Sequence, residues 1–569
     1  MKGNEHAEGV FNRAFILYKP GSSNYKRGWE KTVDKSKLSQ YAKINPIVFY
    51  GGVIFCVIFY GPMLVLREQL QPLGAQVLRA VTYSFDWLWL LLAFGCFIFL
   101  VWLAFGRYGN VKLGGPDDSP EFSRFSWLSM LFTGGVGAGL VYWSMAEPIF
   151  YLKWPPFWGE AFSAQAAQFA IAYGVFHWGV LAWGLFTPGA IAFAYMIYVR
   201  KKPYFYPSYA CRGVLGNVVD GWVGTAINLF VIVGLVGGLG TTMGVVIPMI
   251  SEVIAHMIGV ENTLMVKSGT AVLLSVIFGY SAYSGLRGGI KKLSELNSWL
   301  CFGLLGFVLI AGPTLWMLSF YVDSIGVLLD NFLRMSLYTD PITKSGFPQD
   351  WTVFYWAWWV AWAIYFGLFI ARISKGRTIK DVILNMAFTT TLGCSIFFLV
   401  FGGYAVDLQL NQGLELDAVL AASGGGAMIV AVLESLPFSG IVIPFFVLVM
   451  LIFQATTIDS NAYTIAMISC NEIKYNQEPP RWARLFWCFL LCVIGIAIMS
   501  VGGLQIVQLS SVATSVPIVF IIVILMLSVM KWLKEDFGDA VGPKILTIDY
   551  TESKNAPKTV IDDKITKNI

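Results

Sequence analysis

Residues 351–362 read WTVFYWAWWVAW and open a stretch, residues 351–371, that contains no charged side chain. A helix needs about 20 apolar residues to cross the hydrocarbon core of a bilayer, and this stretch supplies them. Tryptophan usually marks the ends of such helices, where the bilayer meets water. Here Trp358, Trp359 and Trp362 lie well inside the stretch. The segment therefore predicts a membrane helix with an aromatic face, on which Trp359 and Trp362 are helical neighbours.

The whole chain has the composition of a membrane protein. Of its 569 residues, 57% are hydrophobic and only 13% are charged, whereas soluble proteins carry about 25% charged residues. The pattern of apolar runs predicts an all-α polytopic membrane protein with twelve transmembrane helices. We place these spans near residues 47–66, 87–105, 126–152, 169–199, 221–257, 270–286, 298–321, 354–373, 382–404, 441–469, 485–501 and 513–530. The third, fourth, fifth and tenth spans are long enough to be tilted or broken.

Lysine and arginine recur in every second connection between the predicted spans. Cytoplasmic loops carry an excess of these residues, so the pattern predicts that both termini are cytoplasmic. The basic connections hold Arg107 and Lys112, Arg200 to Lys202, Arg287 to Lys292, Arg372 to Lys380, Lys474 to Arg484, and Lys531 with Lys534. The opposite connections carry acids such as Asp340, Asp407 and Asp417. Because these loops account for the net charge of +5, we expect no nucleic-acid partner.

Two polar regions lie outside the predicted spans. Residues 322–350 are too polar to cross a bilayer, and we predict an interfacial helix over about 324–335. The apolar side of this helix would consist of Leu328, Leu329, Phe332 and Leu333. The segment after Lys534 mixes acidic and basic residues, which predicts a poorly ordered tail.

Glycine and tryptophan are concentrated within the spans. Residues 134–139 read GGVGAG, which indicates either local unwinding beside a cavity or a packing face formed by Gly135 and Gly139. Trp178 and Trp183 lie inside the fourth span. A cavity walled by indole rings attracts a cation that cannot donate hydrogen bonds, at about 0.5–2 kcal/mol per contact. The sequence therefore predicts a binding site for a quaternary ammonium or sulfonium head group.

Several motifs resemble those of the betaine/carnitine/choline transporter family. They are PEFS at 120–123 followed by Ser126 and Trp127, the glycine stretch, Glu147 with Pro148, Phe176-His177-Trp178, and the string from Trp351 through Arg372 to Thr378. The resemblance covers the whole run of spans. It implies two inverted five-helix repeats of LeuT type, formed by spans 3–7 and spans 8–12, with spans 1 and 2 additional. It also implies a homotrimer embedded in the lipid of the cell membrane. In a cell with two membranes, this would be the inner one.

This resemblance divides the chain into six segments. They are a cytoplasmic tail (1–46), two additional transmembrane helices (47–110), a first repeat (111–321), an interfacial helix and loop (322–350), a second repeat (351–532) and a cytoplasmic tail (533–569).

The resemblance also implies where the substrate binds. The aromatic box of the family falls on Trp178, Trp183, Phe186, Trp359 and Trp362, with Trp358 beside the central site. Phe186 stands where relatives usually have tyrosine, so this box is more apolar. Gly139 stands where several choline carriers have aspartate, which implies a zwitterion rather than a bare cation. The carboxylate of that zwitterion would bind backbone N–H groups freed near Gly135, Gly137 and Gly139.

Candidate coupling residues lie in span 10 and in the loop between spans 6 and 7. Thr456 and Thr457 would help to hold sodium, as in sodium-coupled relatives, or would bond back to their own helix. Lys291 stands where the sodium-coupled betaine carriers have an uncharged residue, which favours sodium-independent operation, unless it only belongs to the basic loop. Asp459 is a candidate proton site or orients these hydroxyls, and Glu147 is either functional or an exposed capping acid.

The resemblance implies a secondary transporter that imports glycine betaine, dimethylsulfoniopropionate or carnitine, by symport and for osmolyte uptake. The alternatives are a choline or carnitine exchanger and an osmosensor that binds the same ligands. The histidines are His6, His177 and His256, which do not form the paired ligands of a membrane haem enzyme. We therefore expect neither a catalytic centre nor a cofactor.

Overall fold

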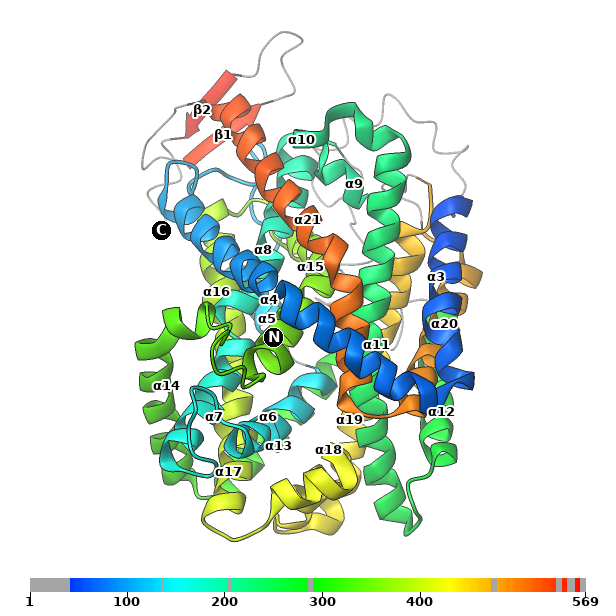
Figure 1. Cartoon of the computed structure of the whole chain (residues 1–569). Helices are drawn as coiled ribbons and strands as arrows, with labels where there is room; N and C mark the ends of the chain where they lie inside the picture. The colour runs from blue at the N-terminus through cyan, green and yellow to red at the C-terminus, as the bar shows by residue number, and fades with distance from the viewer. Residues whose placement is uncertain are drawn as a thin grey trace, which may run out of the picture.

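The computed structural model describes residues 41–134, 137–202, 206–284, 290–471, 478–538, 545–549 and 558–562. These residues form a helical molecule with one small β-hairpin at one end (Figure 1). Ten helices are long and apolar enough to cross a membrane, or eleven if a bent pair is counted as one span. The protein is therefore a multi-pass membrane protein, as predicted.

The first half of the described chain contains two unbroken helices, two broken spans and three further long helices. The elements are α3 (Pro46–Val65), α4 (Arg67–Phe105), α5 (Arg124–Gly134), α6 (Ala138–Lys153), α7 (Ala164–His177), α8 (Val180–Ala194) with a π turn (Tyr195–Val199), the short helices α9 (Pro207–Ala210) and α10 (Arg212–Leu215), a 3-10 turn (Gly216–Asp220), α11 (Trp222–Ile258), α12 (Leu264–Ser284) and α13 (Ile290–Ala311).

The second half begins with a helix that bends sharply away from α13. The elements are α14 (Thr314–Ser336), a π turn (Pro348–Thr352) leading into α15 (Val353–Ile373), α16 (Ile379–Phe397) with a π turn (Phe398–Gly402) leading into α17 (Gly403–Leu410), α18 (Leu416–Glu434), α19 (Ser439–Ile468), α20 (Arg481–Val501), α21 (Leu504–Phe537), and the strands β1 (Ile545–Asp549) and β2 (Lys558–Asp562).

Two predicted spans are broken in their middle. The glycine stretch separates α5, which ends at Gly134, from α6, which begins at Ala138. The second break falls between α7 and α8 at Trp178 and Gly179. The other two long spans, α11 and α19, are continuous helices of 37 and 30 residues. The length of an apolar run therefore did not distinguish a broken span from a long helix.

Other predictions were wrong in their boundaries. The span predicted over 298–321 ends at Ala311, and α14 leaves it at a bend of 105°. Pro313 begins the new helix, since proline lacks an N–H and cannot continue the preceding one. The predicted interfacial helix is the second half of α14. Along this part of α14, Leu329 and Leu333 are exposed, whereas Leu328 and Phe332 pack on the core.

Two further elements were not predicted. α18 lies where we expected a polar connection, and its three consecutive glycines are accommodated by a kink at Gly424, where φ is +83°. The tail predicted to be poorly ordered contains the antiparallel hairpin of β1 and β2, in which Ile545 pairs with Asp562. The concentration of β-branched residues in these two segments is a strand signal, which the prediction from charge composition did not use.

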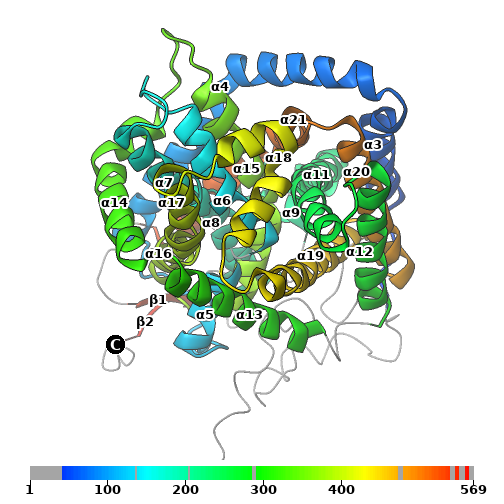
Figure 2. The same ribbon diagram turned by 90° about the horizontal axis from the view of Figure 1, so that it is seen from below.

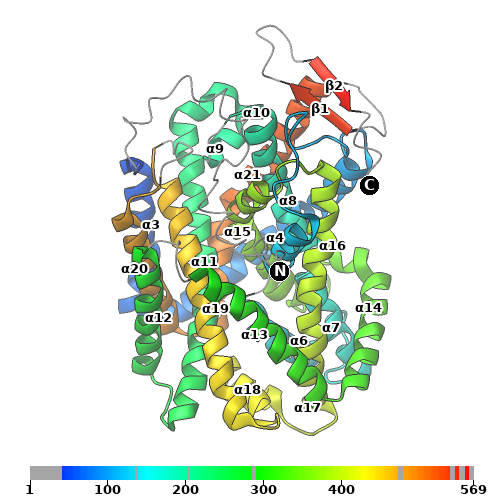
Figure 3. The same ribbon diagram turned by 180° about the vertical axis from the view of Figure 1, so that it is seen from behind.

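The helices that carry the predicted aromatic box lie in the interior. Seen from below, α8 and α15 lie inside a ring formed by the other helices (Figure 2). From behind, α19 runs beside α11 and is crossed by α13 (Figure 3). The short helices α9 and α10 and the hairpin lie at one end of the molecule, whereas α17 and α18 lie at the other (Figures 1 and 3).

Helices α8 and α15 approach each other almost backbone to backbone. A Cβ atom at Gly367 of α15 would lie 2.9 Å from the backbone nitrogen of Ala190 and 3.0 Å from the carbonyl carbon of Gly189, both in α8. Only a residue without a side chain fits at such a distance. This contact brings the aromatic residues of the two helices onto one another.

Candidate substrate site

Three aromatic side chains, from α8 and the break before it, surround one indole of α15. The ring of Trp359 lies 5.0 Å from that of Trp178, 5.4 Å from Trp183 and 5.3 Å from Phe186, measured between centroids. Trp183 and Phe186 also contact each other at 5.5 Å. All four side chains are buried. Four of the five residues predicted for the aromatic box are therefore direct neighbours.

The fifth predicted box residue, Trp362, faces a different helix. It is half-buried, its ring contact is with Tyr365, and its Nε1 lies 2.6 Å from where a Cβ of Gly238 in α11 would be. Among the described residues this Nε1 has no hydrogen-bond partner. Trp362 thus lies beside the cluster rather than in it.

Trp358 connects the cluster to the broken third span. Its ring lies 5.8 Å from that of Trp178, and its indole N–H donates to the carbonyl of Gly238. A Cβ at Gly139, in the first turn of α6, would lie 3.5 Å from the Trp358 ring. Gly137 precedes α6 in an extended conformation with open space beside it. Gly135 lies outside the described residues.

The break between α7 and α8 fixes the orientation of two indoles. The last carbonyls of a helix accept no hydrogen bond within that helix, so they can accept one from another donor. The Trp359 indole donates to the carbonyl of His177 at 2.9 Å, and the Trp183 indole donates to the carbonyl of Trp178 at 3.0 Å. Because these N–H groups are engaged by the backbone, they are not available to donate to a bound molecule.

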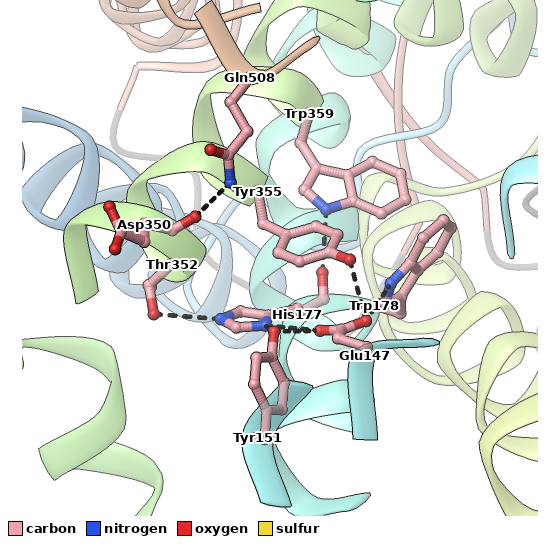
Figure 4. Close-up of polar contacts among 9 residues, drawn as sticks. All are labelled: Glu147, Tyr151, His177, Trp178, Asp350, Thr352, Tyr355, Trp359 and Gln508. Atoms are coloured by element: carbon pink, nitrogen blue, oxygen red, sulfur yellow. Dashed lines mark hydrogen bonds and ion pairs between the residues drawn. The ribbon is translucent and has the colours of Figure 1, made fainter. Parts of the chain in front are cut away.

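A carboxylate lies directly behind this cluster (Figure 4). Glu147 of α6 is fully buried rather than exposed at a helix end. Its Oε2 accepts hydrogen bonds from the Trp178 indole at 3.2 Å and the Tyr355 hydroxyl at 3.0 Å. Its Oε1 lies 2.6 Å from the Tyr151 hydroxyl and 2.8 Å from Nδ1 of His177.

Sequence reasoning named Glu147 only as an uncertain acid and did not assign Tyr151, Tyr355 or His177 to the site. A signal was present, since Glu147 is the one charged residue in the apolar stretch 125–152. Acids at membrane depth are rarely placed there without a partner or a function.

The candidate coupling residues lie in α19 and at the start of α13. Thr456 and Thr457 donate to carbonyls of their own helix, at Ile452 and Phe453 for the first and at Phe453 for the second. Asp459 is buried. Lys291 belongs to α13, but its side chain lies outside the described part of the chain. Within the described residues, no three His, Cys, Asp or Glu side chains could share a metal ion.

An ionic cluster joins the ends of the two box-forming helices outside the membrane-spanning segments. Asp118 lies 2.9 Å from Nζ of Lys375, which follows α15, and 3.6 Å from Nζ of Lys201, which follows the π turn after α8. It also accepts the backbone N–H of Gly115 at 2.8 Å. Burial raises the pKa of Asp118, but these hydrogen bonds and the two lysines outweigh it and hold the pKa below its usual value.

Comparison with known families agrees with the composition, the helices and the motifs. The family described as betaine/carnitine/choline family transporter matches residues 47–538 of the chain. Its members carry small quaternary-ammonium substrates across membranes and are transporters rather than enzymes. The match begins at the first described membrane helix and ends just after the last. The chain belongs to the betaine/carnitine/choline family of transporters.

Proposed function

We propose that the protein is a secondary active transporter that imports a quaternary-ammonium or sulfonium zwitterion by alternating access. The observation that carries the proposal is the cluster of buried rings around Trp359. The substrate site comprises Trp178, Trp183, Phe186, Trp358, Trp359, Trp362, Gly135, Gly137 and Gly139. An onium head cannot donate hydrogen bonds, so ring faces whose N–H groups are already engaged suit it, at about 0.5–2 kcal/mol per ring.

The start of α6 supports a zwitterion rather than a bare cation. The first N–H groups of a helix have no acceptor within it and favour an anion. α6 begins at Ala138, and Gly139 faces Trp358 without a side chain between them. A carboxylate bound there would lie next to the aromatic cluster that holds the cationic head. Glycine betaine, dimethylsulfoniopropionate and carnitine have this pairing of charges.

We further propose twelve spans in two inverted five-helix repeats of LeuT type. α5 with α6 then forms one broken span, α12 and α13 each cross, and α14 and α18 do not. Spans α5–α13 form the first repeat (111–321) and α15–α21 the second (351–532). Helices that we propose do not cross follow the second span of each repeat, the short α9 and α10 in one and the 19-residue α18 in the other. They lie at opposite ends of the molecule, which inverted topology requires (Figure 1).

The remaining assignments follow the same family logic. α3 and α4 (47–110) are additional helices, 322–350 connects the repeats, and the tails 1–46 and 533–569 are cytoplasmic. The assembly is a homotrimer in the cell membrane. For coupling we favour sodium-independent operation, with Lys291 in place of the ion. Asp459, buried in α19, is the candidate proton site.

Uptake by the purified protein in proteoliposomes tests the proposal. Glycine betaine, dimethylsulfoniopropionate, carnitine and choline would be supplied with sodium, proton and counter-substrate gradients imposed separately. We expect uptake of a zwitterion, and Trp359→Ala to reduce it more than about tenfold, since several ring contacts are lost together. Trp222→Ala, which removes an exposed tryptophan at the start of α11, is the matched control and should leave uptake intact.

Two results would contradict the assignments. Near-normal uptake by both Trp359→Ala and Trp178→Ala would exclude the aromatic cluster as the substrate site. An unchanged ion requirement in Lys291→Ala would exclude Lys291 from coupling. Binding of the same ligands without uptake would instead identify a sensor.

A further inference from the structure

The indole N–H of Trp178 differs from those of the other tryptophans in the proposed site. Trp183, Trp358 and Trp359 each donate to a backbone carbonyl, and Trp362 has no acceptor among the described residues. Trp178 donates to the side-chain carboxyl of Glu147 (Figure 4). Trp178 is therefore the one indole in this group whose position and charge environment depend on an acidic side chain.

The hydrogen bonds around Glu147 match an ionised carboxylate. Such a group accepts about four hydrogen bonds and donates none. Four groups that can donate converge on its two oxygens: the hydroxyls of Tyr151 and Tyr355, the Trp178 indole and Nδ1 of His177. If Nδ1 carries the proton, Nε2 of His177 accepts from the Thr352 hydroxyl, 3.1 Å away. Every group is then satisfied with a neutral imidazole and a negative carboxylate.

This carboxylate acts on the substrate site through one ring. An anion that accepts an indole N–H polarises the ring and makes its face more negative, and the effect is strong where water is excluded. Glu147 and Trp178 are 0% and 4% exposed. The Trp178 ring stands nearly perpendicular to those of Trp358 and Trp359, at 89° and 86°, and so forms one wall of the cluster.

Glu147 also holds Trp178 in place at a weak point of the fold. Trp178 lies outside both α7 and α8, at the break between them, and is not fixed by a continuous helix. Its backbone N–H bonds only to the end of α7. The side-chain bond links the ring to α6 and, through Tyr355, to α15, while the rings of Trp358 and Trp359 pack against it.

We propose that Glu147 is a positioning residue that makes the site selective for a positively charged head group, by holding and polarising Trp178. This inference rests on the proposed function and adds the residue that distinguishes a cationic head from a neutral one of the same shape. Glu147 does not need to touch the substrate for this role.

The test compares two probes that differ in one atom. Glycine betaine and 3,3-dimethylbutanoate have the same shape and carboxylate, but carbon replaces the quaternary nitrogen in the second. Their dissociation constants for the purified full-length protein would be measured by calorimetry. We expect Glu147→Gln to lower the wild-type preference for glycine betaine by roughly three- to tenfold, which lies within the range of one cation–π contact. An unchanged preference would overturn the inference.

Glutamine is chosen because it keeps the shape of the site. Its oxygen accepts from Trp178 and Tyr355, while its amide faces Tyr151 and Nδ1 of His177, which becomes an acceptor when the proton moves to Nε2. Glu434→Gln, the same substitution at an exposed glutamate at the end of α18, is the matched control and should leave the preference unchanged. A loss of preference in Glu434→Gln equal to that in Glu147→Gln would indicate general disruption and would also overturn the inference.

A second pair of variants applies even if Glu147→Gln does not fold. Trp178→Phe and Trp183→Phe both keep an aromatic ring and remove an indole N–H, but only the first removes the link to Glu147. The preference should fall further in Trp178→Phe, and equal losses would overturn the inference. The wild-type protein could bind glycine betaine without preferring it, or any other onium compound, to the carbon analogue. Charge selection would then be absent, and this inference would fail alone. If it binds no onium compound, the proposed function fails as well.

Discussion

In the proposed substrate site, Gly139 is the residue at which a side chain could change the charge that is bound. It leaves the start of α6 open next to Trp358, and a Cβ there would lie 3.5 Å from that ring, an ordinary contact distance. We predict that Gly139→Asp is accommodated and places a fixed carboxylate where that of the zwitterion would bind. Like charges repel at such distances, so uptake of glycine betaine should fall at least about tenfold while choline uptake appears.

Gly139→Ala is the control for this substitution, because it adds the Cβ without the charge. It should reduce betaine uptake only modestly and should not introduce choline uptake. Equal behaviour of the alanine and aspartate variants in the proteoliposome assay would mean that space, rather than charge, determines the preference.

Asp118 gives a pH dependence whose sign can be worked out. Its pKa is lower in the folded protein than its ordinary value, so the folded state favours the ionised form. The stability from this group is present above the unfolded pKa, about 3.9, and is lost as the pH falls through the folded pKa. We predict that Asp118→Asn lowers the melting temperature at neutral pH but changes it little in strong acid. Melting curves in detergent at several pH values test this, and a difference that grows as the pH falls would contradict it.

At the scale of elements, the close approach of α8 and α15 determines whether the aromatic cluster forms. A methyl group at Gly367 would lie 2.9 Å from the backbone of α8, which cannot move as a side chain can. Overpacking of this kind costs about 1–3 kcal/mol. We predict that Gly367→Ala lowers the melting temperature and weakens betaine binding together. Gly306→Ala, at a position with nothing within 4 Å in α13, should do neither.

The sequence predicted those elements whose evidence is local. The uncharged run at 351–371 predicted α15, and the glycine density at 134–139 correctly indicated a break between α5 and α6. The bend between α13 and α14 and the kinked helix α18 were missed. In each, proline or glycine ended or bent a helix inside a run that composition alone could not divide.

At the scale of the whole molecule, the contacts between segments far apart in the sequence could not be predicted. Tyr355 and Glu147 are hydrogen-bonded although 208 residues separate them. The indole of Trp359 donates to His177, 182 residues earlier. Periodicity predicts which face of a helix is aromatic, but not which carbonyl or carboxylate will lie opposite. The aromatic residues of the candidate site were therefore predictable one by one, whereas the polar groups that orient them were not.

The proposed twelve-span topology makes a prediction about α18 that a ten-span or eleven-span count does not share. If α18 stays on one side, residues just before and just after it must face the same compartment. Gln412, before α18, and Phe438, after it, are both exposed. The eight native cysteines are buried and should contribute little background. We predict that Gln412→Cys and Phe438→Cys both react with an impermeant maleimide from outside intact cells. Lys202→Cys lies in the first repeat, at the other end of the molecule from α18, and should react only after the membrane is opened. Labelling of Gln412→Cys and Phe438→Cys from opposite sides would make α18 a transmembrane helix, and the two repeats could not then be related by inversion as proposed.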